Sequence, residues 1–375
     1  MVIIENDIFN NIKTAAENIN ISEISGSYDI SDCTFLLKDL SEKIKVISID
    51  EKEKIINSGI NYSEVLSKEE IPDDEYIRLF MDSTEESKYE IAAYTALLAK
   101  KIISHRGKNI ILVSLARAGS PIGALLKRYF KEEYNLDIPH YSISIIRGKG
   151  IDENALLHII NKHNNENLQF IDGWIGKGAI FKELKEAVEI FNQKYNTELN
   201  SELAVIADPT GLTSLSATQE DIFIPSSCLN STVSGLISRT LHNQSFIAPG
   251  DFHGVKIYNE FSEYDLSNFF INKISNCFKK INSLKLSLKS DIIKKENINE
   301  QILKIQKEFS IKEWNKIKPG IGETTRVLLR RNALLVLVKN FDNKNIRHIL
   351  YLAEKKNIKI VEYKDMNYEC AGIIT

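Results

Sequence analysis

The segment between residues 169 and 179 carries residue types that could bind an anion. It reads QFIDGWIGKGA, so an apolar run ends on Asp172 and is followed by three glycines and Lys177. Glycine lets the backbone approach a phosphate closely, and the unpaired N–H groups at the start of a following helix favour negative charge. Asp172 is suited to the hydroxyls of a sugar. We therefore predict a sugar-phosphate site built from Asp172, Gly173, Gly176, Lys177 and Gly178.

A second polar segment follows the apolar run 109–115. It consists of Ala116, Arg117, Ala118 and Gly119. Small residues let backbone amides face outward, and the guanidinium of Arg117 offers a planar donor fork for phosphate or pyrophosphate. The alternative is a plain strand–helix turn with a surface arginine.

A third polar segment follows the apolar run 140–146. Arg147 and Lys149 flank a glycine there. We expect a mobile loop that closes over a polyanion and stabilises charge on a leaving group. The alternative is a solvated turn.

Ser, Thr and Asn side chains gather between residues 224 and 240, without the apolar alternation of a core strand. They predict a pocket for a second substrate. The residues that we assign to it are Asp208, Ser226, Asn230, Ser234, Arg239 and His253. The alternative is structural, with serines such as Ser226 capping the N-terminus of a helix.

Alternating strands and helices must position these segments. Buried strand patterns occupy 109–115, 140–146 and 203–207, and a further apolar run leads into Asp172. Helical spacing follows at 88–105, 122–134, 153–163 and 181–191. The alternation predicts an α/β fold with a doubly wound parallel sheet. Ligands of such sheets bind beyond the carboxyl ends of the strands, where these polar segments fall.

The later part of the chain changes in composition. Residues 262–318 are rich in Lys, Asn and Ile with helical spacing, and residues 318–375 carry more Lys and Arg than Asp and Glu. A basic module on an acidic body suggests a polyanionic partner, although a solvated basic face explains it equally well. We expect four parts: an N-terminal extension (1–85), a main domain (86–262), a helical linker (263–317) and a small C-terminal α/β domain (318–375).

Composition limits the class of protein. The chain has 375 residues, a hydrophobic fraction of 43%, a charged fraction of 26% and a net charge of −3, as in ordinary globular proteins. Its four cysteines lack CxxC spacing, which argues against a zinc knuckle and fits a reducing cytoplasm. The start does not read as a signal peptide, and no apolar run is long enough to span a membrane.

The three polar segments on one parallel sheet resemble the layout of type I phosphoribosyltransferases. The resemblance implies that Asp172 holds the ribose hydroxyls of PRPP, and that Arg117 and the amides of Ala118 and Gly119 hold its pyrophosphate. Its 5-phosphate would be held by Gly173, Gly176, Lys177 and Gly178. Mg²⁺ would arrive with PRPP rather than on a metal site of the protein. Arg147 and Lys149 would close over the leaving group, so the expected catalytic residues are Arg147, Lys149 and Asp172.

The chain more closely resembles a bacterial family found with tellurite-resistance and Ter stress-response genes. The matching segments are 59–64, 113–123, 140–147, 172–178, 224–240 and 251–254. Members are described as phosphoribosyltransferase-like domains with a C-terminal Pelota-type RNA-binding domain, and some carry the name cysteine protease StiP. In the Pelota-like part, the resemblance implies RNA contacts by Gly322, Glu323, Thr325, Arg326 and Arg330.

These observations lead us to expect a cytoplasmic phosphoribosyltransferase-like enzyme in a tellurite- or stress-linked nucleotide pathway, with RNA as a second partner. One alternative is a non-catalytic, nucleotide-sensing RNA-binding protein, because Gly173 stands where the transferase family usually has a second acid. The other is a cysteine protease with Cys228 as nucleophile and His242 or His253 as base. The sequence leaves an oligomer open.

Overall fold

The computed structural model describes residues 11–281 and 298–374, and its centre is an eight-stranded sheet. The strand order is β1-β2-β7-β6-β9-β10-β11, with β8 attached to β7. All neighbours from β2 to β11 are parallel, whereas β1 and β8 are antiparallel additions. The strands are β1 (Glu23–Ile24), β2 (Thr34–Leu36), β6 (Ile111–Ala116), β7 (His140–Ile146), β8 (Gly150–Ile151), β9 (Leu168–Trp174), β10 (Leu203–Ala207) and β11 (Ser216–Thr218). The predicted α/β class with a parallel-rich sheet is confirmed.

Helices cover both faces of this sheet, because its central strands are apolar on both sides. Successive residues of β6 show this: Leu112 packs into one hydrophobic cluster and Val113 into the other. The first cluster includes side chains of α3 (Asp74–Arg106), α4 (Gly119–Tyr134) and α7 (Ser267–Ser275). The second includes those of α5 (Glu153–His163) and α6 (Ala179–Tyr195).

Local chemistry fixes where the long helices begin and end. The side chain of Asp73 accepts a hydrogen bond from the backbone N–H of Tyr76 at 2.8 Å, which caps the start of α3. At its end, Gly107 has a φ of +74°, a conformation that other residues rarely adopt. α4 begins at Gly119, where an added Cβ would lie 2.4 Å from the carbonyl oxygen of Ile171. The start of α4 therefore lies directly against β9.

Smaller elements complete the main body. β3 (Lys38–Asp39) pairs with β12 (Gly254–Val255), and β4 (Val46–Ile47) pairs with β5 (Leu66–Ser67). Further helices here are α2 (Ile49–Asn57), α8 (Phe278–Ile281) and the 3-10 turns η1 (Tyr62–Glu64), η2 (Pro225–Ser227), η3 (Ser231–Val233) and η4 (Asn259–Tyr264). Among the described residues, no helix combines the length and the apolar character needed to cross a membrane.

The C-terminal part forms its own four-stranded sheet in the order β13-β16-β14-β15. Its elements are α9 (Ile298–Glu308), η5 (Trp314–Lys316), β13 (Ile317–Pro319), α10 (Ile321–Arg330), β14 (Ala333–Val338), η6 (Lys344–Ile346), α11 (Arg347–Lys355), β15 (Lys359–Glu362) and β16 (Cys370–Ile374). Ile302 and Ile305 of α9 pack with Ile317 and Leu337 in its core. The predicted small C-terminal α/β domain is confirmed. The domain boundaries stay predictions, and residues 282–297 of the expected linker lie outside the described residues.

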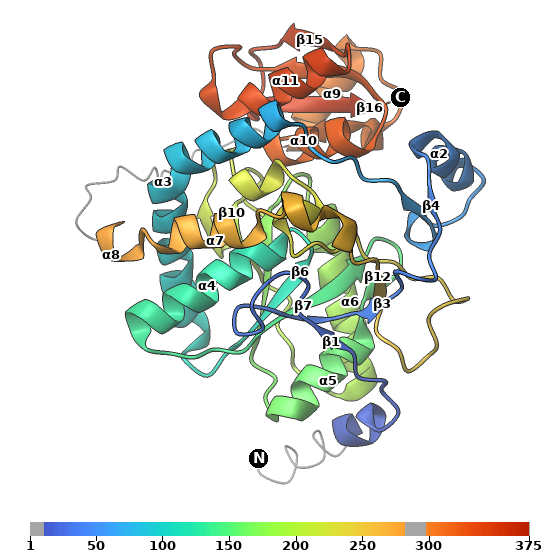
Figure 1. The fold of residues 1–375 in the computed structure, drawn as a ribbon, viewed down its shortest axis with the longest axis vertical. Coiled ribbons are helices and arrows are strands. Elements are labelled where there is room, and N and C mark those ends of the chain that lie inside the picture. Colours follow the sequence, from blue (N-terminus) through green and yellow to red (C-terminus); the bar gives the residue numbers. More distant parts are fainter. Residues whose placement is uncertain (1–10, 282–297, 375) are drawn as a thin grey trace.

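The C-terminal domain rests on the main body. Figure 1 shows it, in red, above the large sheet, with one end of α3 beside it. Tyr351 of α11 stacks on Tyr76 of α3 with 5.9 Å between ring centroids. The Tyr351 hydroxyl donates a hydrogen bond to Asp73 at 2.9 Å, and Lys355 forms an ion pair with the same carboxylate. The cap of α3 therefore also anchors the C-terminal domain.

Candidate functional site

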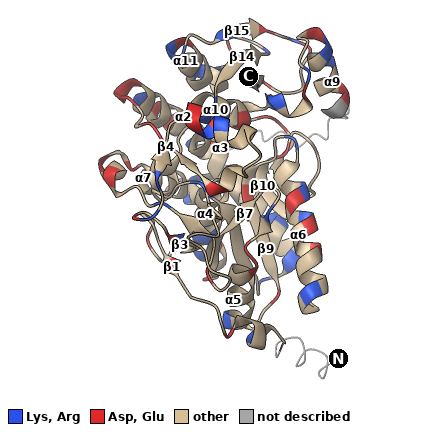
Figure 2. Cartoon of the chain, turned by 90° about the vertical axis from the view of Figure 1, so that its right-hand side faces the viewer, with Lys and Arg blue, Asp and Glu red and all other residues tan. Residues whose placement is uncertain are grey.

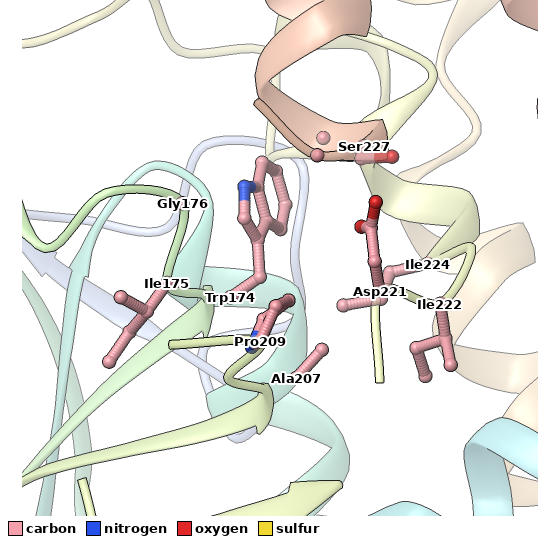
Figure 3. A pocket seen from close by; sticks show the side chains of 11 residues that line it. Trp174, Ile175, Gly176, Ala207, Pro209, Asp221, Ile222, Ile224 and Ser227 are labelled. Atoms are coloured by element: carbon pink, nitrogen blue, oxygen red, sulfur yellow. The ribbon is translucent and has the colours of Figure 1, made fainter. Parts of the chain in front are cut away.

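The segment after β9 that we predicted to bind a phosphate is covered by the C-terminal domain. An added Cβ at Gly322 of α10 would lie 2.2 Å from the Trp174 ring, and one at Gly176 would lie 2.7 Å from Cγ of Glu323. The Tyr368 hydroxyl donates to the carbonyl oxygen of Gly176 at 3.1 Å. Figure 3 shows Trp174 beside a small cavity at this contact. The segment is thus part of a domain interface.

Two charged residues of that segment face a larger cavity of about 670 Å³ that is also lined by Arg147. Oδ1 of Asp172 accepts a hydrogen bond from the N–H of Gly173 at 2.7 Å, and burial raises the pKa of Asp172 to about 6. Nζ of Lys177 donates to the carbonyl oxygen of Trp314 at 2.9 Å. Burial, together with the charge of Lys318, lowers the pKa of Lys177 to about 7. The charged form of Lys177 is therefore less favoured than that of an exposed lysine.

The side chain of Arg117 is buried and paired inside the protein. Its Nη2 lies 2.7 Å from a carboxylate oxygen of Glu69, and its Nη1 donates to the carbonyl oxygen of Ile237 at 2.7 Å. Both side chains are at least nine-tenths buried. Burial alone would raise the pKa of Glu69, but Arg117 and Arg330 hold it below its usual value. The guanidinium is thus half of a buried ion pair, while Ala116 ends β6 and Ala118 precedes α4.

The segment 147–150 is held against α6 in this structure. The carboxylate of Glu183 accepts hydrogen bonds from the N–H groups of Gly148 and Gly150, both at 2.9 Å. The N–H of Arg147 donates to the Tyr62 hydroxyl at 3.0 Å, and its side chain lines the 670 Å³ cavity. Lys149 instead lies 3.9 Å from Glu64 and lines a different cavity. The two cations expected to act together are therefore separated.

The residues assigned to a second substrate pocket do not line one cavity. Asp208 accepts from the N–H groups of Thr210 and Thr213 at 3.0 and 2.9 Å, so it organises a turn. Asn230 accepts a hydrogen bond from Nε of Arg330 at 2.5 Å, across the domain contact. The others are divided among different surroundings: Ser226 is buried, Ser234 donates to the carbonyl oxygen of Asn230, Arg239 lies over Tyr62, and His253 lines a separate cavity.

Most of the residues expected to contact RNA face the main body. Arg326 lies over the Trp174 ring at 4.4 Å and pairs with Glu323 at 2.7 Å. Thr325 is buried and its hydroxyl lies 2.8 Å from Nε2 of His348. Gly322 lies on Trp174 and Arg330 on Asn230, so four of the five predicted residues lie at the interface, whereas Thr325 is buried inside the C-terminal domain.

One residue of the domain interface, Asp221, was not predicted from the sequence. The carboxylate of Asp221 accepts hydrogen bonds from the N–H groups of Ile321 and Glu369, at 3.0 and 2.9 Å. Figure 3 shows this side chain reaching toward the C-terminal domain. A lone Asp in a loop gives no sequence signal for such a role, because its partners are backbone groups that lie 100 and 148 positions away.

The four cysteines are all buried and free. Burial raises the pKa of the Cys228 thiol well above its usual value. The Tyr76 hydroxyl donates to the carbonyl oxygen of Cys228 at 2.7 Å. His242 and His253 lie with their ring centroids 4.7 Å apart beside another cavity, where His253 contacts the Ser144 hydroxyl at 2.8 Å. In the described part of the chain, no hydrogen bond joins a cysteine to a histidine.

Comparisons with known proteins decide the family. Residues 26–275 match the family model described as "Tellurite-like stress resistance cysteine protease StiP", and residues 297–375 match the PELOTA RNA binding domain. A protein of Acinetobacter baylyi named "Cysteine protease StiP" is 33% identical over 374 residues, which cover 96% of each chain. This chain belongs to the StiP family. No solved structure matches it.

Membership of the StiP family corrects the predicted activity. The expectation of a phosphoribosyltransferase was wrong, because the matching family model and the relative are both named for a cysteine protease. The geometry gives a physical reason why the pattern misled: Arg117 pairs with Glu69 and Gly176 lies against Glu323. The resemblance to StiP and to Pelota domains is confirmed, whereas neither PRPP nor the phosphoribosyltransferase fold has support among the comparisons.

Three expectations from the sequence stay predictions: Mg²⁺ as a cofactor, an oligomer, and the roles assigned to single residues. Among residues 11–281 and 298–374, no group of three or more His, Cys, Asp or Glu side chains could hold a metal ion.

Proposed function

We propose that this chain is a cysteine-dependent hydrolase of tellurite-like stress resistance whose C-terminal domain binds RNA. The observation that carries the proposal is the similarity to a protein named cysteine protease StiP along nearly the whole of both chains. The match of residues 297–375 to the PELOTA RNA binding domain, together with the basic character of that region, supports the second part.

Cys228 is the nucleophile that fits this proposal best. Only Cys33 and Cys228, of the four cysteines, fall within the region that matches the StiP model. Cys33 follows Asp32, whose carboxylate pairs with Arg128 at 2.6 Å and whose carbonyl oxygen lies 2.7 Å from His140. These contacts indicate that the residues around Cys33 stabilise the fold. Cys228 instead follows Ser227, which lines the small cavity at the domain contact (Figure 3).

The described conformation is then the resting one. A thiolate, not a thiol, attacks a carbonyl carbon, and the buried Cys228 keeps its proton. In the active conformation a base takes this proton, the thiolate forms a thioester as the peptide C–N bond breaks, and the amine leaves with the proton. Water then hydrolyses the thioester. The expected bases, His242 and His253, lie beside another cavity, so activation requires a rearrangement around Cys228.

Hydrolysis of quenched fluorescent casein by the full chain tests the proposal, with and without single-stranded RNA. We expect turnover that the Cys228→Ser variant loses and that the Cys33→Ser variant keeps. The matched control removes the other buried cysteine of the StiP region. Equal turnover in wild type and Cys228→Ser would remove Cys228 as the nucleophile, and absence of turnover under both conditions would overturn the assignment as a peptide hydrolase.

A further inference from the structure

A small cavity between α2 and α10 holds an excess of positive charge. Its volume is about 200 Å³, and six cationic side chains line it against one carboxylate, that of Glu323. Figure 2 shows blue segments of α10 beside α2. Two of the cations come from the main body and four from the C-terminal domain: Lys52, Arg239, Lys318, Arg326, Arg330 and Arg331.

Ion pairs with the protein account for only part of this charge. Arg326 pairs with Glu323 at 2.7 Å, and Arg331 pairs with Glu53 at 2.8 Å. Lys52 instead donates to two neutral oxygens, the Ser67 hydroxyl and the carbonyl oxygen of Arg330, both at 3.2 Å. Positive charge remains after these pairs are counted, and like charges in a poorly solvated site repel one another.

Arg239 shows the strain of this arrangement most clearly. Its Nη2 donates to the carbonyl oxygen of Val65, whereas its Nη1 is buried without a hydrogen-bond partner. Burial and the neighbouring cations Arg117 and Arg331 lower its pKa to about 10. Burial and the charges of Arg331 and Arg239 likewise lower the pKa of Lys52 to about 8. A bound anion would relieve both effects and satisfy the free donor.

The small cavity adjoins the larger one of about 670 Å³. The two share Tyr62, Lys318, Glu323, Arg326 and Arg331 as lining residues. The larger cavity adds the aromatic side chains of Trp174, Phe181 and Trp314. It also adds three cations and three carboxylates, so the excess of positive charge comes from the residues that the two cavities share and from the smaller one: Arg147, Lys177 and Lys182, and Asp172, Glu183 and Glu186. The indole N–H of Trp174 is also buried without a partner.

Cations beside aromatic rings are the features by which proteins hold single-stranded nucleic acid. The cations track the phosphates, and bases stack on the rings with little regard to sequence. The sequence analysis predicted that RNA contacts α10 alone, but Gly322 and Thr325 of that helix are buried. A groove lined by residues of both domains therefore suits RNA better.

We propose that the two joined cavities form an interdomain cleft that binds single-stranded RNA. Phosphates lie among the six cations, and bases lie against Tyr62, Trp174 and Trp314. The inference rests on the proposed RNA binding of the C-terminal domain and adds that the main body supplies part of the site. RNA bound here would hold the two domains together.

Binding of a fluorescently labelled single-stranded RNA of about ten nucleotides to the full chain, followed by anisotropy, tests the cleft. The test variant is Arg147→Gln, Lys318→Gln, Arg331→Gln combined. The matched control is Lys344→Gln, Lys359→Gln, Lys364→Gln, which removes three exposed lysines of the C-terminal domain that line neither cavity. We expect at least a tenfold weaker affinity and a shallower dependence on salt for the test variant, because each lost phosphate contact removes about 0.7 from the slope for single strands. The control should bind as the wild type does.

The outcomes separate this inference from the proposed RNA binding. If both triple variants weaken the affinity for RNA equally, or if neither weakens it, the cleft is overturned but RNA binding stays in place. No binding by the wild type overturns both. Binding of inorganic tripolyphosphate without binding of RNA shows a small-anion site and also overturns the inference.

Cross-linking gives a second readout that does not depend on how the variants fold. RNA that contains 4-thiouridine is irradiated with the wild-type chain, and the modified peptides are identified by mass spectrometry. We expect cross-links at Tyr62, Trp174 or Trp314. Cross-links confined to residues 339–364 would overturn the cleft.

Discussion

Trp174 at the end of β9 packs directly on Gly322 of α10, so closely that an added Cβ at position 322 would lie 2.2 Å from Cε2 of the indole. The contact explains why glycine occupies this position of the Pelota-like motif. It also places the end of a central strand under the C-terminal domain. The two domains therefore share one interface at the carboxyl ends of the strands, where α/β proteins usually bind ligands.

The Gly322→Ala variant tests this contact. The added methyl group must displace the partly buried Trp174 ring, which we expect to cost about 1–3 kcal/mol of stability. Chemical unfolding measures the loss. The matched control is Gly173→Ala, where the nearest atom would lie at an ordinary 3.4 Å. Similar stabilities for the two variants would show that the domains are not packed as described.

Asp221 provides a second test of the interface. In the Asp221→Ala variant the N–H groups of Ile321 and Glu369 lose their acceptor. Each buried donor left without a partner costs about 1–3 kcal/mol. We expect a clear fall in the unfolding free energy, measured in urea. Asp137→Ala, which removes an exposed carboxylate 3.5 Å from Lys127, should change stability by less than about 1 kcal/mol.

Asp152 predicts a specific dependence of stability on pH. Burial raises the pKa of its carboxyl from 3.8 to about 7, although the N–H groups of His253 and Ala155 donate to it. Between these values the folded chain keeps a proton that the unfolded chain has lost. The stability contributed by this group is therefore present below about pH 4 and falls as the pH rises toward 7.

The Asp152→Asn variant isolates that contribution, because Asn cannot titrate while His242, His253 and Lys149 stay in place. We expect the stability of the wild type to fall relative to the variant as the pH rises from about 4 to 7, measured by urea unfolding at each pH. Parallel curves for the two proteins would show that Asp152 is ionised in the folded chain.

The buried thiol of Cys228 predicts slow alkylation. Its raised pKa leaves little thiolate at neutral pH, so iodoacetamide should modify it in the folded chain far more slowly than in urea. The Tyr351→Ala variant removes the ring that stacks on Tyr76, next to Cys228, and should increase the rate. Mass spectrometry of the peptide that contains Cys228 gives both rates. Rapid labelling of the folded wild type would contradict the burial described.

The alternation of apolar strands and amphipathic helices predicted most of the main body. The strand 140–146 and the helix 153–163 occur where their patterns placed them, because burial on one or both faces leaves a strong periodic signal. Boundaries moved where packing decided them. The helix expected at 88–105 is the second half of α3, which begins at Asp74.

The site was harder to predict than the fold. Glycines after β9 suggested an open anion cradle, but a glycine required by a neighbouring side chain has the same sequence signature, and Gly176 is of that kind. Arg117 looked like a ligand group because its partner Glu69 lies far away in sequence. The domain interface arises from residues that are distant along the chain, and local patterns carry no information about such pairs.

The most direct test of the proposed hydrolase is to trap its nucleophile. The full chain is incubated with a peptide that carries a chloromethyl ketone, with and without single-stranded RNA, and the modified residue is found by mass spectrometry. The proposal predicts modification of Cys228 in proportion to the loss of casein hydrolysis. Hydrolysis that persists after complete modification of Cys228, or loss of hydrolysis with Cys228 unmodified, would contradict it.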